Sequence, residues 1–346
     1  MIELLSRIYL ALHLFVFRRR KARSVKFPMR VVSIGNLSMG GTGKTPLVAY
    51  LAQKSSKLNP MVVLRGYGGT SSGLVSDGQR VVSNFDQAGD EAMLLAQISG
   101  LRVAAGSDRA HLIRTYGDSA KIIFLDDAFQ NPSIQRDVDL VLIDASLAPQ
   151  SLRVLPGGKF RENVDALERA NAVLLTRADS PHASAWISKL RVRFPRLPVF
   201  QSVHEFAGLS PLVQRAGNAG SVKKQKTKPG LPKQASAFCG IGNPRAFFEM
   251  LTRAGIDLKR RRDFGDHHRY SSREVNEFVQ GTGPWITTEK DAVRLRAIEL
   301  DEAILKSIWI ARLSLRITVG EKTFLKLVLG NSLKAKNRAR PGANQR

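Results

Sequence analysis

A glycine-rich turn between a short apolar run and a helix-forming segment constrains the fold of this chain more than any other feature. Residues 38–45 read Ser-Met-Gly-Gly-Thr-Gly-Lys-Thr. They match the phosphate-binding pattern G-x-x-x-x-G-K-[ST] except that Ser38 stands at its first position. The apolar run Arg30–Ile34 precedes this turn, and Thr45–Gln53 follows it with helical spacing and with Pro46 where a helix tolerates proline. This strand–loop–helix order predicts a binding site for a nucleoside triphosphate.

The residue types in this loop suit phosphate binding. Glycines let backbone N–H groups approach phosphate oxygens, and the helix N-terminus adds its positive end. Lys44 can bridge the β- and γ-phosphates, and the Thr45 hydroxyl can bind Mg²⁺. A glycine-rich turn with a chance lysine is the plain alternative, and the flanking strand and helix argue against it. The predicted nucleotide site comprises Ser38, Met39, Gly40, Gly41, Thr42, Gly43, Lys44 and Thr45.

Short continuous apolar runs alternate with polar or helical stretches along the rest of the chain. Because such strands are covered on both faces, they predict an α/β fold with a parallel sheet of P-loop NTPase type. The runs after the first are Met61–Leu64, Leu101–Ala105, Ile122–Leu125, Leu140–Ile143 and Val173–Thr176. A second α/β set has runs at Ala235–Gly240, Leu258–Phe264, Trp285–Thr288 and Ile308–Leu313, with helices from Pro244, Ser271 and Glu289.

The length of 346 residues suggests about two domains, and breaks in the pattern suggest their limits. Residues 204–235 carry glycine, proline and lysine without helical periodicity, which indicates a hinge and a lysine-rich insert. We expect an N-terminal helix and basic segment, a P-loop domain, this hinge, a second and smaller α/β domain, and a C-terminal helix with a basic tail. Their respective ranges are 1–28, 29–203, 204–235, 236–320 and 321–346.

Positive charge gathers in three segments rather than over the whole chain. The chain has 54 Lys+Arg against 29 Asp+Glu, a formal net charge of +25. Residues 1–30, 221–234 and 331–346 hold 18 of the basic residues and a single acidic one. Such segments usually contact an anionic partner, although solvated charge is an equal alternative for the insert and tail. The single cysteine, Cys239, excludes a disulfide framework and an all-cysteine metal site.

The N-terminus favours a membrane surface as that partner. Residues 2–17 are mostly apolar, and RRRKAR follows directly. The stretch is shorter than a bilayer span of ~20 residues, and its charges follow the apolar run, unlike those of a secretory signal. Leu4, Leu5, Ile8, Leu12 and Phe15 can share one face of an interfacial helix, with the basic cluster at anionic headgroups. A helix packed on the domain is the first alternative, and a single span is a less favoured one.

A pair of carboxylates at a strand end gives a second signal of a nucleotide site. The segment KIIFLDDAFQN, residues 121–131, is an apolar strand that ends in Asp126 and Asp127. A P-loop enzyme holds Mg²⁺ with a carboxylate at the tip of a neighbouring parallel strand. Solvated strand-end acids would look the same, so this motif gains weight only from the phosphate loop.

The segment GNLSMGGTGKTP, residues 35–46, resembles that of the tetraacyldisaccharide 4′-kinases, bacterial inner-membrane enzymes of lipid A synthesis. This family begins its P-loop with Ser or Thr, which accounts for Ser38. The resemblance covers about residues 1–296 in an unbroken order of motifs. These are LRGYGG (64–69), GDEAMLLA (89–96), SDR (107–109), FLDDAFQN (124–131), LPGGKFRE (155–162), CGIGNP (239–244), FGDHH (264–268) and TTEKDAV (287–293).

The resemblance implies roles for individual residues. Lys44 and Thr45 would serve the phosphates and Mg²⁺, with Glu91, Asp126 and Asp127 as further metal ligands. Asp90 would be the general base that takes the proton from the sugar 4′-hydroxyl, and His267 would lie beside it. Arg161 and Glu162 would sit on a lid over the nucleotide. The acceptor site would be lined by Arg65, Tyr67, Arg109 and Gln130.

Each role also has a plain structural alternative in the sequence. Asp90 could cap a helix, His267 could be an ordinary loop histidine, and the turn at Arg65–Gly68 could be only a turn. Two positions of the strand-end motif also differ from the family's usual residues, and Lys159 stands in the lid segment where the family has proline. Ala128 stands where the family has glycine, which disfavours a positive φ there, and Asn131 stands where it has histidine.

The resemblance implies an ATP- and Mg²⁺-dependent kinase. Its acceptor would be an acylated glucosamine disaccharide 1-phosphate at the cytoplasmic face of the inner membrane. A membrane-associated P-loop NTPase that acts on a protein partner is the alternative, and the sequence does not identify such a partner. A nucleic-acid partner is not expected, because the charge lies outside the predicted domains and no nucleic-acid-binding signature is present.

Overall fold

A computed structural model of the chain describes residues 2–150, 152–212, 230–279 and 283–330. Their strands form one twelve-stranded sheet in the order β10-β9-β11-β12-β8-β7-β6-β1-β5-β2-β4-β3. The pairs β8–β12 and β3–β4 are antiparallel, and the other neighbouring strands pair in parallel. The predicted parallel α/β fold is confirmed, but its two sets of strands share a single sheet.

The strands are β1 (Arg30–Asn36), β2 (Met61–Leu64), β3 (Gly73–Asp77), β4 (Arg102–Ala105), β5 (Ile122–Asp126), β6 (Val138–Asp144), β7 (Ala172–Thr176), β8 (Val199–Pro211), β9 (Gln234–Cys239), β10 (Asp257–Asp263), β11 (Trp285–Thr288) and β12 (Ile308–Val319). The helices are α1 (Ile2–Ala22), α2 (Lys44–Lys54), α3 (Phe85–Ala88), α4 (Asp90–Leu95), α5 (Arg109–Tyr116), α6 (Ala183–Arg193), α7 (Pro244–Arg253), α8 (Ser272–Phe278), α9 (Glu289–Leu295), α10 (Glu302–Ser307) and α11 (Glu321–Leu329).

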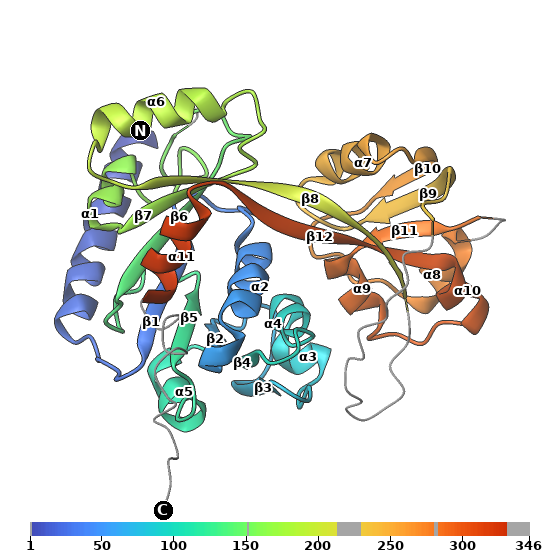
Figure 1. Cartoon of the computed structure of the whole chain (residues 1–346), viewed down its shortest axis with the longest axis horizontal. Coiled ribbons are helices and arrows are strands. Elements are labelled where there is room, and N and C mark those ends of the chain that lie inside the picture. Colours follow the sequence, from blue (N-terminus) through green and yellow to red (C-terminus); the bar gives the residue numbers. More distant parts are fainter. Residues whose placement is uncertain (1, 151, 213–229, 280–282, 331–346) are drawn as a thin grey trace, which may run out of the picture.

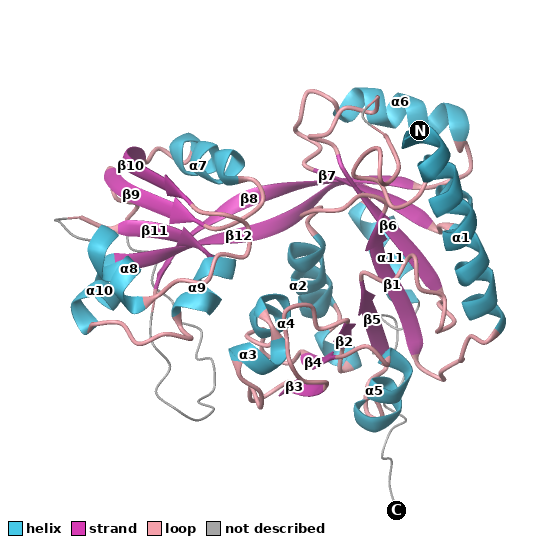
Figure 2. Ribbon diagram, turned by 180° about the vertical axis from the view of Figure 1, so that it is seen from behind, coloured by secondary structure: helices cyan, strands magenta, loops and turns pink. Residues whose placement is uncertain are grey.

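The sheet passes through two lobes of unequal size, joined by the long strands β8 and β12 (Figures 1 and 2). The larger lobe holds β1–β7 with α1–α6, and the smaller lobe holds β9–β11 with α7–α10. Strand β12 begins beside β11 and then pairs with β8 as far as Val319 opposite Gln201. Helix α11 therefore returns to the larger lobe, where Phe324 packs edge-on against Phe200.

Both ends of the predicted hinge over 204–235 lie in strands of the structure. Residues 204–211 belong to β8, and β9 already begins at Gln234. Residues 213–229, which include most of the lysine-rich insert, lie outside the described residues, as does the basic tail at 331–346. Strand β8 escaped prediction because its residues alternate in burial where the ribbon joins the lobes, so it lacks a continuous apolar run.

Helix α1 packs on the larger lobe with one side and exposes apolar residues on the other. Tyr9 and Leu10 pack against a buried cluster of that lobe, and Ser6 Oγ donates a hydrogen bond to the Val154 carbonyl at 3.1 Å. The face predicted from the sequence stays in contact with solvent, and Phe15 is 63% exposed. The exposed members are Leu4, Leu5, Ile8, Leu12 and Phe15. Among the described residues, no helix combines the length and apolar character that a membrane crossing requires.

Candidate active site

The phosphate-binding loop connects β1 to α2 as predicted, and neighbouring strand ends fix its shape. Thr176 Oγ1 donates to the Thr42 carbonyl at 2.9 Å, and Arg177 Nη2 donates to the Gly41 carbonyl at 3.2 Å. Gly43 has a φ of 88°, and a Cβ there would stand 2.9 Å from the imidazole of His204. The loop thus needs glycine at this position both for its backbone conformation and for the space beside β8.

Lys44 and Arg161 converge on Asp127, at the end of β5. Lys44 Nζ lies 3.4 Å from Asp127 Oδ1, and Arg161 Nη1 donates to Asp127 Oδ2 at 2.8 Å. Burial would raise the pKa of the Asp127 carboxyl, but the two cations outweigh it and hold that pKa below its usual range. The positive φ that the family motif suggested for position 128 occurs instead at Asp127, so Ala128 is compatible with this backbone.

Asp126 supplies a second buried carboxylate beside Asp127. Burial raises the pKa of Asp126 to about 6, Lys44 opposes this shift, and the nearby charge of Glu91 adds to it. Asp126 Oδ1 and Asp127 Oδ1 are buried without a hydrogen-bond partner. Within the described chain, no three carboxylate, imidazole or thiol groups cluster closely enough to hold a metal by themselves. This donor set fits Mg²⁺, which is usually bound by one or two carboxylates together with water and phosphates.

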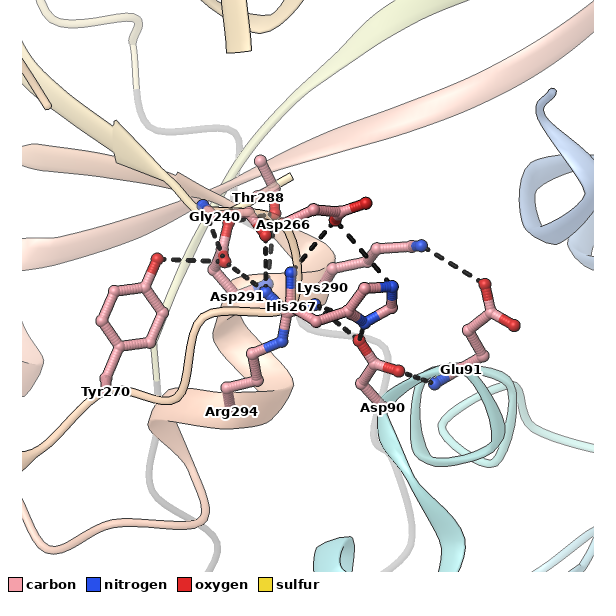
Figure 3. A network of polar contacts seen from close by, with 10 residues as sticks. All are labelled: Asp90, Glu91, Gly240, Asp266, His267, Tyr270, Thr288, Lys290, Asp291 and Arg294. Carbon is pink, nitrogen blue, oxygen red and sulfur yellow. Dashed lines mark hydrogen bonds and ion pairs between the residues drawn. The ribbon is translucent and has the colours of Figure 1, made fainter. Parts of the chain in front are cut away.

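Asp90 and His267 meet where the two lobes touch, although 177 positions separate them in the sequence. His267 Nδ1 lies 2.9 Å from Asp90 Oδ2, and the imidazole is 57% exposed. A carboxylate can only accept, so Nδ1 is the donor in this contact. Figure 3 shows that Asp90 and Glu91 come from the larger lobe, and that Lys290 points toward Glu91 from the smaller one.

The turn before α4 places Asp90 beside the predicted acceptor loop. Gly89 has a φ of 78°, and a Cβ there would stand only 2.4 Å from the Tyr67 carbonyl oxygen. The chain can approach the loop at residues 65–69 this closely only because residue 89 is glycine. Asp90 is thereby buried at the start of α4, directly after this close contact with the loop.

Gly89→Ala is expected to impair both folding and phosphoryl transfer. Gly89 combines a φ of 78° with a ψ of 167°, a conformation essentially restricted to glycine, which costs another residue about 1–3 kcal/mol. The collision with Tyr67 adds about 1–3 kcal/mol and shifts Asp90, so we expect kcat to fall by about 10²-fold. Gly100→Ala is the matched control, because Gly100 has a φ of 79° and open space around its Cβ position. Equal melting temperatures and equal kcat for the two variants would contradict the close-approach argument.

The smaller lobe adds residues to this site that the sequence did not single out. Arg294 Nη2 donates to Asp90 Oδ2 at 2.5 Å, and Arg294 Nη1 donates to the Gly240 carbonyl and to Asp291. Burial would raise the pKa of Asp90, but Arg294, His267 and Lys290 together lower it. The TTEKDAV motif covered Lys290 and Asp291 without assigning either a role, and Arg294 follows it directly.

The four predicted acceptor residues fall into two pairs. Arg65 and Tyr67 lie on the exposed loop next to Gly89, and Arg65 Nη1 donates to the Tyr67 hydroxyl at 2.7 Å. Arg109 is buried, and its Nη2 donates to the carbonyls of Asp126 and Asp127. Gln130 Nε2 donates to the carbonyl of Asn36. Arg109 is therefore fixed against the end of β5, and Gln130 is fixed against the end of β1, while their part in binding the acceptor stays a prediction.

The predicted lid contacts the phosphate-binding loop, but Glu162 points away from it. The Met39 N–H donates to the Lys159 carbonyl, and the Arg161 N–H donates to the Leu37 carbonyl. Glu162 is buried, and both of its carboxylate oxygens accept from Arg169 at 2.6 Å. The Glu162 carboxylate is therefore paired within the larger lobe, and its predicted place on a lid over the nucleotide stays a prediction.

Comparison with known proteins agrees with this arrangement over nearly the whole chain. A family model described as tetraacyldisaccharide-1-P 4′-kinase (LpxK) matches residues 1–332. The tetraacyldisaccharide 4′-kinase of Desulfotalea psychrophila is 38% identical over 311 residues, which cover 84% of this chain and 86% of that protein. That of Syntrophobacter fumaroxidans is 37% identical, over 80% of this chain and 74% of its own.

A solved structure of LpxK from Aquifex aeolicus in complex with ATP has a similar fold. Its TM-score is 0.75 at 27% sequence identity, and the match covers 94% of this chain and 96% of that one. The sequence and structural matches extend over both lobes and the site between them. The chain therefore belongs to the tetraacyldisaccharide-1-phosphate 4′-kinase family.

Proposed function

We propose that this protein transfers the γ-phosphoryl group of ATP to the 4′-hydroxyl of a tetraacylated glucosamine disaccharide 1-phosphate. The observation that carries the proposal is the Asp90–His267 pair, which lies beside Glu91 and the acceptor loop at the junction of the lobes. The residues predicted to bind phosphate and metal gather at the ends of β1 and β5. Membership of the family supports the same activity.

The phosphate side of the reaction needs positioning and charge neutralisation. Lys44 would move from Asp127 to the β- and γ-phosphates, and the loop N–H groups would hold their oxygens. Arg161, on the lid, would leave Asp127 for the same phosphates. Thr45, Asp126 and Asp127 would hold Mg²⁺, with Glu91 nearby. The ion would supply charge neutralisation at the phosphoryl oxygens.

The acceptor side needs a destination for one proton. Asp90 would take it from the 4′-hydroxyl, and His267 would orient the carboxylate or carry the proton onward to solvent. The exposure of the His267 side chain, which is 57%, suits such a relay. Arg65, on the exposed loop beside Asp90, would meet an anionic group of the substrate.

The direct test measures label from γ-labelled ATP in lipid A disaccharide 1-phosphate presented in detergent micelles. We expect Mg²⁺-dependent label in the lipid. An otherwise identical acceptor that already carries a 4′-phosphate should remain unlabelled. Label in neither lipid, with free phosphate released instead, would favour the alternative of an NTPase that acts on a protein partner.

We also propose that α1 holds the enzyme on an anionic membrane surface, at the cytoplasmic face of the bacterial inner membrane. The exposed apolar face of α1 faces away from the lobe, and the basic residues of 18–23 end the helix. An amphipathic helix with this division binds at the lipid interface, where the basic residues meet anionic headgroups.

The triple variant Leu4→Ser, Leu12→Ser and Phe15→Ser should bind vesicles of anionic phospholipid about 100-fold more weakly. Each of these side chains, half-buried in the membrane, should contribute about 1 kcal/mol to the binding free energy, and the substitution to serine removes this contribution. Sedimentation with the vesicles measures this binding. The control is Val82→Ser with Val319→Ser, since these valines are exposed and belong to neither α1 nor the helix α6 beside it. Equal binding by the two variants would contradict the proposed role of α1.

A further inference from the structure

The best-fixed contact of Asp90 comes from Arg294 rather than from His267. The Arg294 side chain is 3% exposed, whereas His267 lies on an exposed loop. Both residues bind Asp90 Oδ2, at 2.5 Å and 2.9 Å. In Figure 3, Arg294 reaches Asp90 from α9, on the opposite side of the lobe junction.

The other end of the guanidinium is anchored within the smaller lobe. Arg294 Nη1 donates to the Gly240 carbonyl at 2.7 Å and to Asp291 Oδ1 at 3.0 Å. Asp291 is fully buried and is itself fixed by Thr288, Tyr270 and the Gly240 N–H. The planar guanidinium of Arg294, bonded to Asp291 on one side and to Asp90 on the other, allows the two carboxylates only a narrow range of relative orientations. Arg294 therefore transmits the position of α9 to the Asp90 carboxylate.

The contacts of Asp90 leave one direction open for a substrate proton. Its Oδ1 accepts from the Glu91 N–H at 2.9 Å, and its Oδ2 accepts from both Arg294 and His267. A carboxylate has about four lone-pair sites, so the remaining one belongs to Oδ1. Because Arg294 and His267 occupy Oδ2, the oxygen left free to receive a proton is Oδ1.

We propose that Arg294 is a positioning residue, which occupies Asp90 Oδ2 so that Oδ1 faces the acceptor hydroxyl when the lobes are together. This inference rests on the proposed function, and it extends the catalytic pair to a third residue supplied by the smaller lobe. His267 can leave Asp90 during turnover, while buried Arg294 keeps the carboxylate in place. Arg294 does not touch the nucleotide loop in the described contacts, so it acts on the acceptor half of the reaction.

The test is a double-mutant cycle with Arg294→Met and Asp90→Asn in the labelled-lipid assay. Arg294→Met should lower kcat by about 10²-fold through misplacement of the base, with KM for ATP within about twofold of wild type. Added to Asp90→Asn, it should cost less than about twofold more, because its effect passes through Asp90. Arg294→Lys should recover part of kcat, because it retains a charge but not the fork.

Arg296→Met is the matched control, since Arg296 crosses the same junction and donates to another residue of the larger lobe, Gln97 Oε1, at 2.7 Å. It should leave kcat within about twofold of wild type. The inference is overturned if Arg294→Met lowers kcat equally with and without Asp90→Asn, or if it raises KM for ATP as much as it lowers kcat. The ATP-binding stoichiometry of each variant gives its folded fraction. If Arg294→Met does not fold, the double-mutant cycle is measured with Arg294→Lys in its place. Wild-type protein that labels no lipid would overturn the proposed function instead.

Discussion

Lys44→Ala is expected to reduce phosphoryl transfer to the lipid by about 10²–10³-fold, the cost of removing one preorganised electrostatic donor. Lys44 begins α2, where loop N–H groups and a helix N-terminus can together bind an anion. Its ammonium is largely buried and lies 3.4 Å from Asp127 Oδ1. When ATP binds, we expect this charge to pass from Asp127 to the phosphates, so both kcat and ATP affinity should suffer.

The control for this variant is Lys54→Ala at the other end of the same helix. Lys54 is exposed, and its Nζ lies 2.9 Å from Glu321 Oε1. An ion pair exposed to water in this way contributes little to the free energy of unfolding. Removal of the Lys54 side chain should leave kcat within about twofold of wild type, and the two variants should melt within a few degrees of each other. Rates equal to wild type in Lys44→Ala would mean that the loop at 38–45 does not bind the transferred phosphate.

The strands buried on both faces could be predicted from the sequence because burial leaves a local mark. Met61–Leu64 and Trp285–Thr288 occur in the structure with the predicted bounds, since both are continuous apolar runs. Strand β12 continues to Val319, beyond the predicted Leu313, because its later half alternates along the ribbon. Its pairing with β8 joins the two strand sets into one sheet, and this depends on contacts about 100 positions apart.

Candidate site residues could be predicted from the sequence where they lie together in one short motif, as in residues 38–45. They were harder to predict where the fold brings distant parts of the chain together. The contact of Asp90 with His267 followed from the family resemblance, and the structure contains it. Arg294 could not be found in this way, because 204 positions separate it from Asp90 and an arginine in a helix is usually a surface residue. The ion pair of Glu162 with Arg169 also left no recognisable pattern in the sequence, although only seven positions separate the two residues.

Asp90→Asn is expected to lower kcat for lipid phosphorylation by about 10²–10⁴-fold, the range that general base catalysis contributes. Asparagine matches the shape of the side chain and can still accept from Arg294, so the lobes should stay together. Its amide cannot take a proton from the 4′-hydroxyl. Since Lys44 and the phosphate-binding loop are untouched, ATP affinity should remain within about twofold of wild type, and kcat should carry the loss.

Asp86→Asn separates this effect from a general loss of charge near the junction. Asp86 is exposed, and its carboxylate lies 3.9 Å from Arg269 of the smaller lobe without reaching Asp90 or His267. We expect its kcat to match wild type within about twofold, as for most surface substitutions. If Asp90→Asn kept the wild-type kcat, the hydroxyl proton would have to leave by another route. The Asp90 carboxylate would then serve mainly to hold Arg294 and His267 across the junction of the lobes.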